Sequence, residues 1–247
     1  MWPCTYFGQE HWVETKETHF VELPPKDKLQ PINGYGSQRV LTEGDSRLLP
    51  EYRDPTQKTM NMTLKSISVA PRAFEIPNFL SETEVDHILQ LAGGITLTRS
   101  SVGDVGSGQS KSEGGASDTR TSLNSWVKRE MSPILDAIYR RAADVLRIDE
   151  ALLRPRDNKE RTDWPSKSSL AEHLQLVHYD PGQEYTAHHD FGFSDLSDLQ
   201  GARFSTLLLY LNDEGLVGGE TTFPRWVNAE SFERLKVQPK AGKVSLD

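Results

Sequence analysis

Two adjacent histidines and an aspartate lie within the aromatic-rich stretch YTAHHDFGF, residues 185–193. In an extended chain, side chains two positions apart project from the same face. We therefore expect His188 and Asp190 to converge and His189 to point away from them. An imidazole and a carboxylate on one face of a strand are two of the three ligands of the facial triad that holds non-haem Fe(II). The pattern thus predicts part of an iron site.

A His-x-Asp match has little specificity by itself. The chain contains seven histidines, and roughly 0.4 such matches would arise by chance in a chain of this composition. The alternative interpretation is a surface strand whose polar side chains face solvent. The elements around the motif have to decide between the two.

The composition is that of a polar, acidic protein. The 247 residues are 36% hydrophobic and carry a formal net charge of -8, which argues against nucleic acid or an anionic membrane as the main partner. No apolar run approaches the roughly 20 residues that a transmembrane helix needs. Cys4 is the single cysteine, which excludes a disulfide within the chain and a cysteine-based zinc site.

The chain is predicted to divide near residue 67. Residues 1–67 are polar and show no sustained period, so we expect an extension that is partly disordered. Residues 68–247 are expected to form one domain, which begins with a strand around Phe74 and Ile76.

Two helices are predicted early in this domain. Residues 81–92 begin with Ser81 and Glu84 as a capping box. Residues 132–146 begin with Ser132 as the N-cap. The expected buried faces are Val85, Ile88, Leu89 and Ala92 in the first helix and Ile134, Leu135, Ile138, Ala142 and Val145 in the second.

The segment between the helices is rich in Gly and Ser over residues 100–118. Such a composition predicts a flexible loop. It is compatible with a plain surface loop and with a mobile lid beside an active site, since lids need low local stability.

The second half of the domain is predicted to be a series of short strands. Residues 173–179 alternate with a period of two, DPGQ at 180–183 is a turn, and residues 184–191 form the next strand. Further strands are expected at 203–213, buried on both faces, at 218–224, and from 237 onward. Helices followed by short strands indicate an α+β fold, with the helices outside a β-sandwich or jelly roll.

Five motifs in serial order resemble the prolyl 4-hydroxylase family over roughly residues 68–247. The catalytic core of that family is matched by LQLVHYDPGQEYTAHHDF, STLLLYLND and GGETTFP, and its N-terminal helical portion by PRAFEIPNFLSETEVDHILQLA and TRTSLNSWV. The resemblance implies a double-stranded β-helix and a dioxygenase dependent on Fe(II) and 2-oxoglutarate. The implied activity is that of a procollagen-proline 4-dioxygenase-like oxidoreductase, which acts on prolyl residues of a protein or peptide and incorporates O2.

The same resemblance implies L-ascorbate as the reductant that maintains Fe(II), and the endoplasmic reticulum as the compartment. It makes His188 and Asp190 the first two iron ligands, in agreement with the parity argument. Tyr179 matches a tyrosine of the 2-oxoglutarate pocket, where a phenol can donate to a carboxylate. The alternative for Tyr179 is a buried core tyrosine.

Three further residues take candidate roles from the resemblance. Thr206 and Tyr210 fall on the strand that crosses the barrel interior and are candidate cofactor-binding residues. Inward-facing residues of a barrel strand are usually packing residues, which is the alternative for both. Arg120 lies in the loop that closes over the peptide substrate in relatives.

Two residues of the family pattern have no match in this sequence. They are a distal histidine, which completes the triad, and a later lysine or arginine, which pairs with the far carboxylate of 2-oxoglutarate. Both would follow the motif at 237–247, and Lys240 and Lys243 precede the place of the distal histidine. We therefore expect a C-terminally truncated member that lacks its final strands, and a 247-residue chain that is inactive and marginally stable.

Three functions remain open on the sequence alone. The first is prolyl hydroxylation of a protein or peptide. The second is a 2-oxoglutarate oxygenase with another substrate, because the substrate loops are the least patterned part of the chain. The third is a non-catalytic jelly-roll binding module that has retained two of the metal ligands.

Overall fold

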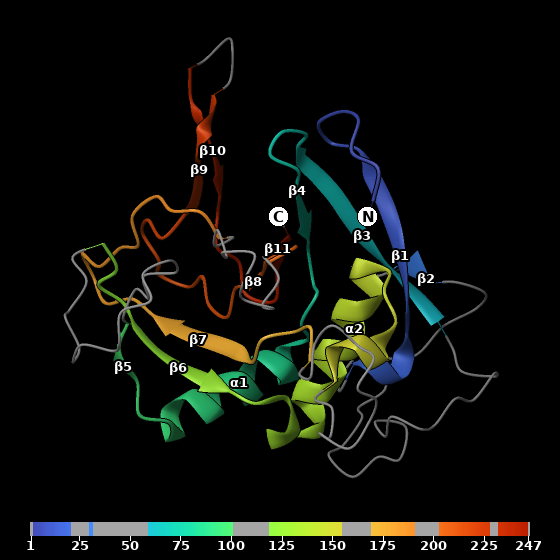
Figure 1. The fold of residues 1–247 in the computed structure, drawn as a ribbon, viewed down its shortest axis with the longest axis horizontal. Helices are drawn as coiled ribbons and strands as arrows, with labels where there is room; N and C mark the ends of the chain where they lie inside the picture. The colour runs from blue at the N-terminus through green and yellow to red at the C-terminus, as the bar shows by residue number, and fades with distance from the viewer. Residues whose placement is uncertain are drawn as a thin grey trace, which may run out of the picture. The chain divides into compact units, whose positions relative to one another are not determined.

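The computed structural model describes residues 2–20, 30–31, 59–100, 119–154, 169–190, 203–227 and 232–246. These residues form a mixed α+β fold with two α-helices and antiparallel sheets of six, two and three strands (Figure 1). The chain divides into two compact units. Unit 1 comprises Met1–Leu91, Arg129–Glu150 and Leu207–Asp247, and unit 2 comprises Ala92–Lys128 and Ala151–Thr206.

The six-stranded sheet belongs to unit 1. Its strands follow the order β1-β3-β4-β11-β8, β2 pairs with β3, and every pairing is antiparallel. The sheet therefore joins strands from the two ends of the chain. The strands are β1 (Glu10–Lys16), β2 (Gln30–Pro31), β3 (Thr59–Ser68), β4 (Ala73–Ile76), β8 (Leu207–Leu209) and β11 (Val244–Leu246).

Three of these strands, β1, β2 and nearly all of β3, come from the segment that was expected to be a polar extension. β1 and β3 pair over their whole common length, from Glu10 opposite Lys65 to Lys16 opposite Thr59. Val13 and Leu64 are fully buried, so the paired strands contribute to the core of unit 1. These strands are not evident in the sequence, because the alternation in β3 is carried partly by Met and Ser rather than by β-branched residues.

The two predicted helices are confirmed, but three positions expected on their buried faces are not buried: Leu89 is exposed, and Ala92 and Ala142 are half-buried. α1 (Glu82–Gly94) begins with the expected capping box, in which the amide of Glu84 donates to Ser81 Oγ at 3.2 Å and the amide of Ser81 donates to Glu84 Oε2 at 2.9 Å. α2 (Pro133–Leu146) has Ser132 as its N-cap, which accepts from the amide of Leu135 at 3.2 Å. Leu89 was expected on the buried face of α1 but is 43% exposed.

A buried ion pair connects the two helices. Arg141 Nη2 of α2 donates to Glu84 Oε2 of α1 at 2.8 Å, and both side chains are completely buried. The guanidinium carbon of Arg141 lies 3.8 Å from the ring centroid of Phe20 and 4.8 Å from that of Phe79. Burial lowers the pKa of Arg141, and the adjacent Glu84 carboxylate opposes this effect.

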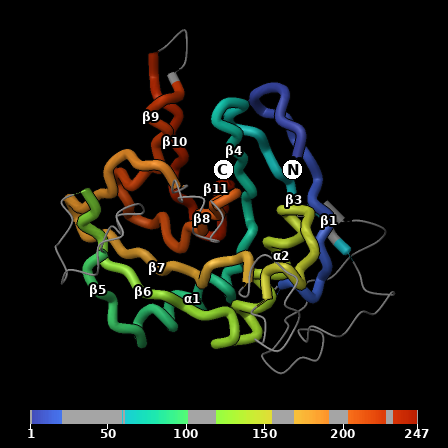
Figure 2. Tube along the Cα trace, in the orientation of Figure 1, coloured from blue at the N-terminus to red at the C-terminus, as the bar shows by residue number. Residues whose placement is uncertain are grey.

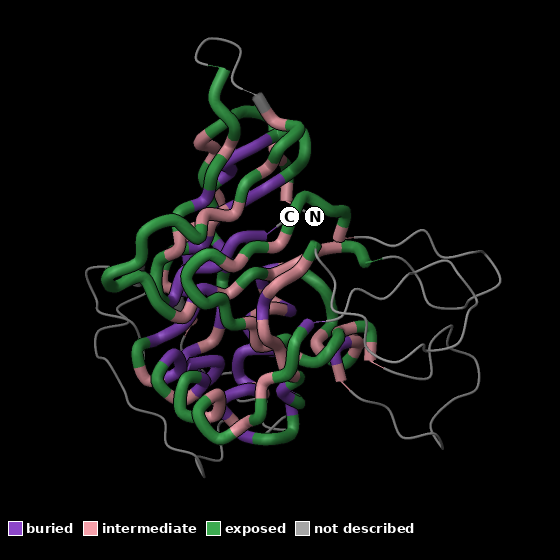
Figure 3. Tube along the Cα trace, turned by 90° about the vertical axis from the view of Figure 1, so that its left-hand side faces the viewer, coloured by how far each residue is buried: buried purple, intermediate pink, exposed green. Residues whose placement is uncertain are grey.

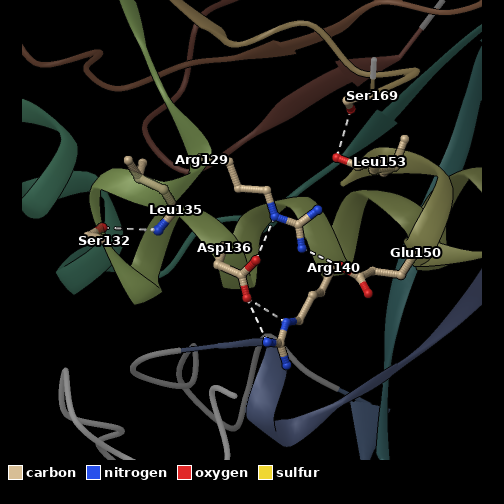
Figure 4. A network of polar contacts seen from close by, with 8 residues as sticks. All are labelled: Arg129, Ser132, Leu135, Asp136, Arg140, Glu150, Leu153 and Ser169. Carbon is tan, nitrogen blue, oxygen red and sulfur yellow. Dashed lines mark hydrogen bonds and ion pairs between the residues drawn. The ribbon is translucent and has the colours of Figure 1, made fainter. Parts of the chain in front are cut away.

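A second polar network ties α2 to the short helices around it. Arg129, in the 3-10 helix η4 (Arg129–Met131), contacts the carboxylates of Asp136 and Glu150 (Figure 4). Arg140 Nη2 reaches the other oxygen of Asp136 at 2.6 Å. Two further 3-10 helices are η1 (Glu17–His19), which contacts α2, and η5 (Glu150–Leu153).

The remaining strands of unit 1 form a hairpin. β9 (Thr221–Val227) pairs with β10 (Arg234–Val237) in an antiparallel two-stranded sheet. Val237 is buried and belongs to a core cluster with Ile67 and Ala73. In β10, Arg234 and Lys236 are exposed, Leu235 is half-buried and Val237 is buried; Figure 3 colours the chain by these three classes. The strand predicted at 218–224 is present as β9 with shifted ends. Of the strand predicted from 237 onward, only Val244–Leu246 forms, as β11, and Val237 itself ends β10.

Unit 2 contains a three-stranded antiparallel sheet. Its order is β5 (Thr98–Arg99), β6 (Leu123–Val127) and β7 (Leu174–His178), and β6 and β7 run side by side in Figure 2. β7 confirms the strand predicted at 173–179. The predicted turn follows it, with the amide of Gln183 donating to the carbonyl of Asp180 at 3.0 Å and Gly182 at a φ of 82°.

Two strand predictions are wrong. No strand forms within 184–190, where Tyr185 makes an isolated bridge with Arg120 and the following residues are irregular. The strand expected over 203–213 is reduced to β8, and Leu208 is 39% exposed, so it is not buried on both faces. An apolar run indicates a strand but does not fix how many neighbours cover it.

Two further features bear on the sequence analysis. Across the described segments, neither helix has the length and apolar character that a bilayer-spanning helix requires. The Gly- and Ser-rich segment 100–118 lies outside the described residues except for Ser100.

Candidate functional site

The candidate ligand segment is held in unit 2 by main-chain pairing with the loop before β6. The amide of Thr121 donates to the carbonyl of Glu184 at 3.1 Å, and the amide of Thr186 donates to the carbonyl of Thr119 at 2.9 Å. The amide of Glu184 in turn donates to Thr121 Oγ1 at 2.9 Å. The turn at 180–183 returns the chain to this loop, so the two predicted ligands follow directly after an anchored stretch.

His188 and Asp190 converge as the sequence predicted, although not by strand geometry. His188 Nε2 lies 3.0 Å from Asp190 Oδ1, and the two side chains are 37% and 38% exposed. His188 Nδ1 donates to the carbonyl oxygen of Thr186 at 2.8 Å. A metal-binding histidine commonly donates its second ring nitrogen to a carbonyl in this way, which fixes the tautomer and leaves Nε2 available to the metal.

Tyr185 packs against the candidate ligand. Its ring stacks on the ring of His188, with centroids 3.6 Å apart and an interplanar angle of 18°. The guanidinium carbon of Arg120 lies 4.8 Å from the centroid of the same Tyr185 ring. Arg120 also donates to Ser122 Oγ and to Gln175 Oε1, both at 3.3 Å. The predicted substrate residue Arg120 and the predicted metal ligand His188 therefore both contact the ring of Tyr185.

Tyr179 lies in the same unit as His188, Asp190 and Arg120. It is 45% exposed, which differs from the buried core tyrosine considered as the alternative. Partial burial raises the pKa of the Tyr179 phenol, whereas a hydrogen bond with Ser122 and the positive charge of Arg120 lower it. The net effect is an increase, so the phenol stays protonated and can donate a hydrogen bond at neutral pH.

The two remaining predicted residues lie on either side of the boundary between the units. Thr206 is half-buried and directly precedes β8. Tyr210 belongs to unit 1, where it is 9% exposed, and its hydroxyl is 2.8 Å from Thr221 Oγ1. Tyr210 also packs against the cluster formed by Ile67, Ala73 and Val237. These contacts are those of a packing residue, the alternative considered for this position.

Two residues beside the candidate ligands were not identified from the sequence. Arg203 donates from Nη1 to the main-chain carbonyl of Asp190 at 3.1 Å and binds both carboxylate oxygens of Glu172, at 2.7 and 3.2 Å. No motif connects these positions, which are 31 residues apart. Their only signal in the sequence is that a basic residue directly precedes the apolar run of β8.

The donor set fits a divalent iron ion but is incomplete. An imidazole nitrogen and a carboxylate oxygen are two of the donors that non-haem Fe(II) takes in a facial triad. Within the described residues, no group of three or more His, Cys, Asp or Glu side chains is arranged to hold a metal ion. His188 and Asp190 are thus the two candidate ligands that the described residues bring together.

Known proteins were compared with the chain at the levels of sequence and structure. No family model matches it. Probable prolyl 4-hydroxylase 3 from Arabidopsis thaliana is 30% identical over 229 residues, which cover 87% of this chain and 71% of that protein. Probable prolyl 4-hydroxylase 11 from the same plant is 30% identical over 247 residues, which cover 97% and 76%.

Other relatives are matched over a smaller part of their length. Probable prolyl 4-hydroxylase 4 from Arabidopsis thaliana is 33% identical over 186 residues, and the chain spans 54% of it. The chain spans about half the length of several of these curated relatives. Among solved structures, the viral collagen prolyl hydroxylase vCPH from Paramecium Bursaria Chlorella virus-1 matches with a TM-score of 0.44 and 22% identity, covering 70% of this chain and 76% of that one. On the sequence relationships, the chain belongs to the prolyl 4-hydroxylase family.

Proposed function

We propose that this protein is an Fe(II)- and 2-oxoglutarate-dependent dioxygenase that hydroxylates prolyl residues of a protein or peptide. The observation that carries the proposal is the pair His188 and Asp190. His188 Nε2 lies 3.0 Å from Asp190 Oδ1, and His188 Nδ1 donates to the carbonyl of Thr186. Membership of the prolyl 4-hydroxylase family supports the same chemistry. The proposal includes a double-stranded β-helix as the architecture of residues 68–247.

The residues of unit 2 would divide the work between metal, cosubstrate and substrate. When bound, Fe(II) and 2-oxoglutarate supply the oxidative decarboxylation that activates O2 for insertion into a C–H bond, and ascorbate maintains the reduced metal. His188 Nε2 and Asp190 Oδ1 would bind the metal. Tyr179 would donate a hydrogen bond from its phenol to a carboxylate of 2-oxoglutarate.

Three residues have secondary roles in this proposal. Arg120 would contact the peptide substrate. Its guanidinium packs on the Tyr185 ring, and the same ring stacks on the candidate metal ligand His188. Thr206 would line the cosubstrate pocket, whereas Tyr210 is a residue of unit 1 whose hydroxyl already bonds to Thr221. Cosubstrate binding by Tyr210 would therefore require that hydroxyl to serve two partners.

A non-catalytic binding module is the second candidate function. It is favoured by the lack, among the described residues, of a third ligand grouped with His188 and Asp190.

The deciding experiment measures succinate formation and oxygen incorporation together. The 247-residue chain and the longest protein encoded by its reading frame are incubated with Fe(II), 2-oxoglutarate, ascorbate and a proline-rich peptide, or with the same peptide carrying alanine for proline. We expect the longer protein to add one oxygen atom to the proline peptide and Asp190→Asn to abolish this. Turnover of both peptides alike would indicate another substrate, and metal binding without turnover in either protein would establish the binding module.

A further inference from the structure

Arg203 forms a fork that connects Glu172 to the backbone of the candidate ligand Asp190. Its Nε donates to Glu172 Oε1 at 2.7 Å and its Nη2 donates to Glu172 Oε2 at 3.2 Å. The third nitrogen, Nη1, donates to the main-chain carbonyl of Asp190 at 3.1 Å. All three residues belong to unit 2.

The two bonds to Glu172 fix the orientation of the Arg203 guanidinium. A guanidinium is planar, and a carboxylate that binds two of its nitrogens fixes the plane and the rotation of the group. With Nε and Nη2 both bound to Glu172, Nη1 is left pointing at the carbonyl of Asp190. A lysine ammonium at this position would keep the positive charge but could not make the same three bonds.

The ligand segment needs an anchor at this point. Main-chain pairing with the neighbouring loop extends to Thr186, and residues 187–190 are not part of a strand. His188 is fixed from its own side by the carbonyl of Thr186 at 2.8 Å. The bond from Arg203 supplies the corresponding restraint on the backbone of Asp190, from which the carboxylate projects toward His188.

We infer that Arg203 is a positioning residue for the metal ligand Asp190 and that Glu172 orients Arg203 for this role. The inference rests on the proposed function, because it takes Asp190 as a metal ligand. It is distinct from a simple charge effect. A positive charge beside a cation site weakens metal binding by repulsion, whereas a positioning bond strengthens it by holding the ligand in place.

The test uses Mn(II) titration of the purified 247-residue chain, followed by electron paramagnetic resonance of the free ion. The variants are Arg203→Lys, Glu172→Gln, their combination, His188→Ala, and Arg99→Lys as a control with an exposed arginine on β5 of the same unit. Arg203→Lys keeps the charge and removes the fork, so it isolates the geometric effect. We expect it to weaken Mn(II) binding about tenfold, the lower end of the effect seen for outer-shell partners of metal ligands.

The other variants separate positioning from folding. Glu172→Gln should weaken binding by a smaller factor, and the double variant should resemble Arg203→Lys, because both act through the same bond. Thermal unfolding should barely change, since the Arg203–Glu172 pair is half exposed and such pairs add little to stability. Arg99→Lys should bind Mn(II) like the unchanged protein.

Two outcomes distinguish failure of this inference from failure of the proposed function. If His188→Ala loses Mn(II) binding while Arg203→Lys binds as tightly as the unchanged protein, Arg203 does not position Asp190 and the site itself stands. If His188→Ala binds as the unchanged protein does, or the unchanged protein binds no Mn(II), the metal site is wrong and this inference is overturned with it.

Discussion

His188 Nε2 faces Asp190 Oδ1 at 3.0 Å while His188 Nδ1 donates its proton to the carbonyl of Thr186. In a neutral ring with the proton on Nδ1, Nε2 presents a lone pair to the carboxylate. Two lone pairs at this distance repel each other unless a proton or a metal cation lies between them. The arrangement is therefore that of two donors prepared to share one cation.

The first prediction compares the two neighbouring histidines. His188→Ala should abolish specific Mn(II) or Fe(II) binding, because it removes the nitrogen that faces Asp190. His189→Ala should largely retain binding, since the adjacent position is not required for that pairing. Metal titration of both variants checks this. Equal losses in the two variants would show that the assignment of ligands is wrong.

The second prediction concerns the ionisation of Tyr179. Its pKa is raised by burial, so its tyrosinate absorbance, obtained as the difference from Tyr179→Phe, should appear at higher pH than that of free tyrosine. Because the folded pKa exceeds the unfolded one, the associated stabilisation is present below the unfolded pKa and is lost as pH rises through the folded pKa.

Arg120 provides the directional control for Tyr179. The positive charge of Arg120 lowers the pKa of this phenol, so Arg120→Gln should move the ionisation to still higher pH. A midpoint for Tyr179 at or below that of free tyrosine, or a downward movement in Arg120→Gln, would contradict the environment described here.

The third prediction concerns the buried pair of Glu84 and Arg141. Glu84→Gln removes the carboxylate that is paired with the completely buried guanidinium of Arg141 and should lower the free energy of unfolding by about 3–5 kcal/mol. Glu82→Gln, an exposed position in the same first turn of α1, is the matched control and should change it by less than about 0.5 kcal/mol. Urea denaturation measures both, and similar small losses would mean that the pair is not buried in solution.

The fourth prediction separates packing from cosubstrate binding at Tyr210. Tyr210→Phe removes the hydrogen bond with Thr221 and should cost about 0.5–1.5 kcal/mol of unfolding free energy. Thr221→Val should cost a similar amount, and the double variant should cost less than the sum.

Tyr179 and Tyr210 can also be compared for their contribution to the affinity for 2-oxoglutarate. We expect Tyr179→Phe to weaken 2-oxoglutarate binding more than Tyr210→Phe, because the hydroxyl of Tyr210 is already bonded within unit 1. Calorimetric titration of 2-oxoglutarate in the presence of Mn(II) makes the comparison. A larger loss in Tyr210→Phe would instead assign the cosubstrate pocket to Tyr210.

Local features were predictable from the sequence by itself. The capping box of Ser81 and Glu84, the N-cap Ser132, the turn at 180–183 and strand β7 were all confirmed. The two caps and the turn depend on interactions between residues at most a few positions apart, and β7 is marked by its own alternation, so the local pattern of residue types is sufficient to predict them. The serial order of the motifs likewise identified the family.

The tertiary structure decided which segments pair and which charges meet. β1 and β3 join the sheet of unit 1 by pairing with each other, although more than forty residues separate them in the sequence. The weak alternation in β3 does not indicate which strand it pairs with. His188 and Asp190 converge through an irregular segment held by Thr186 rather than through a strand.

The ion pairs show the same limit most clearly. Glu84 and Arg141 are 57 residues apart, and Arg203 and Glu172 are 31 residues apart. Apart from Glu84, which the capping box marks, each of these residues has the character of an ordinary solvated charge when the sequence is considered alone. Only the folded chain brings the opposite charges together, because long-range contacts are selected by packing of whole elements and leave no periodic signal in the sequence.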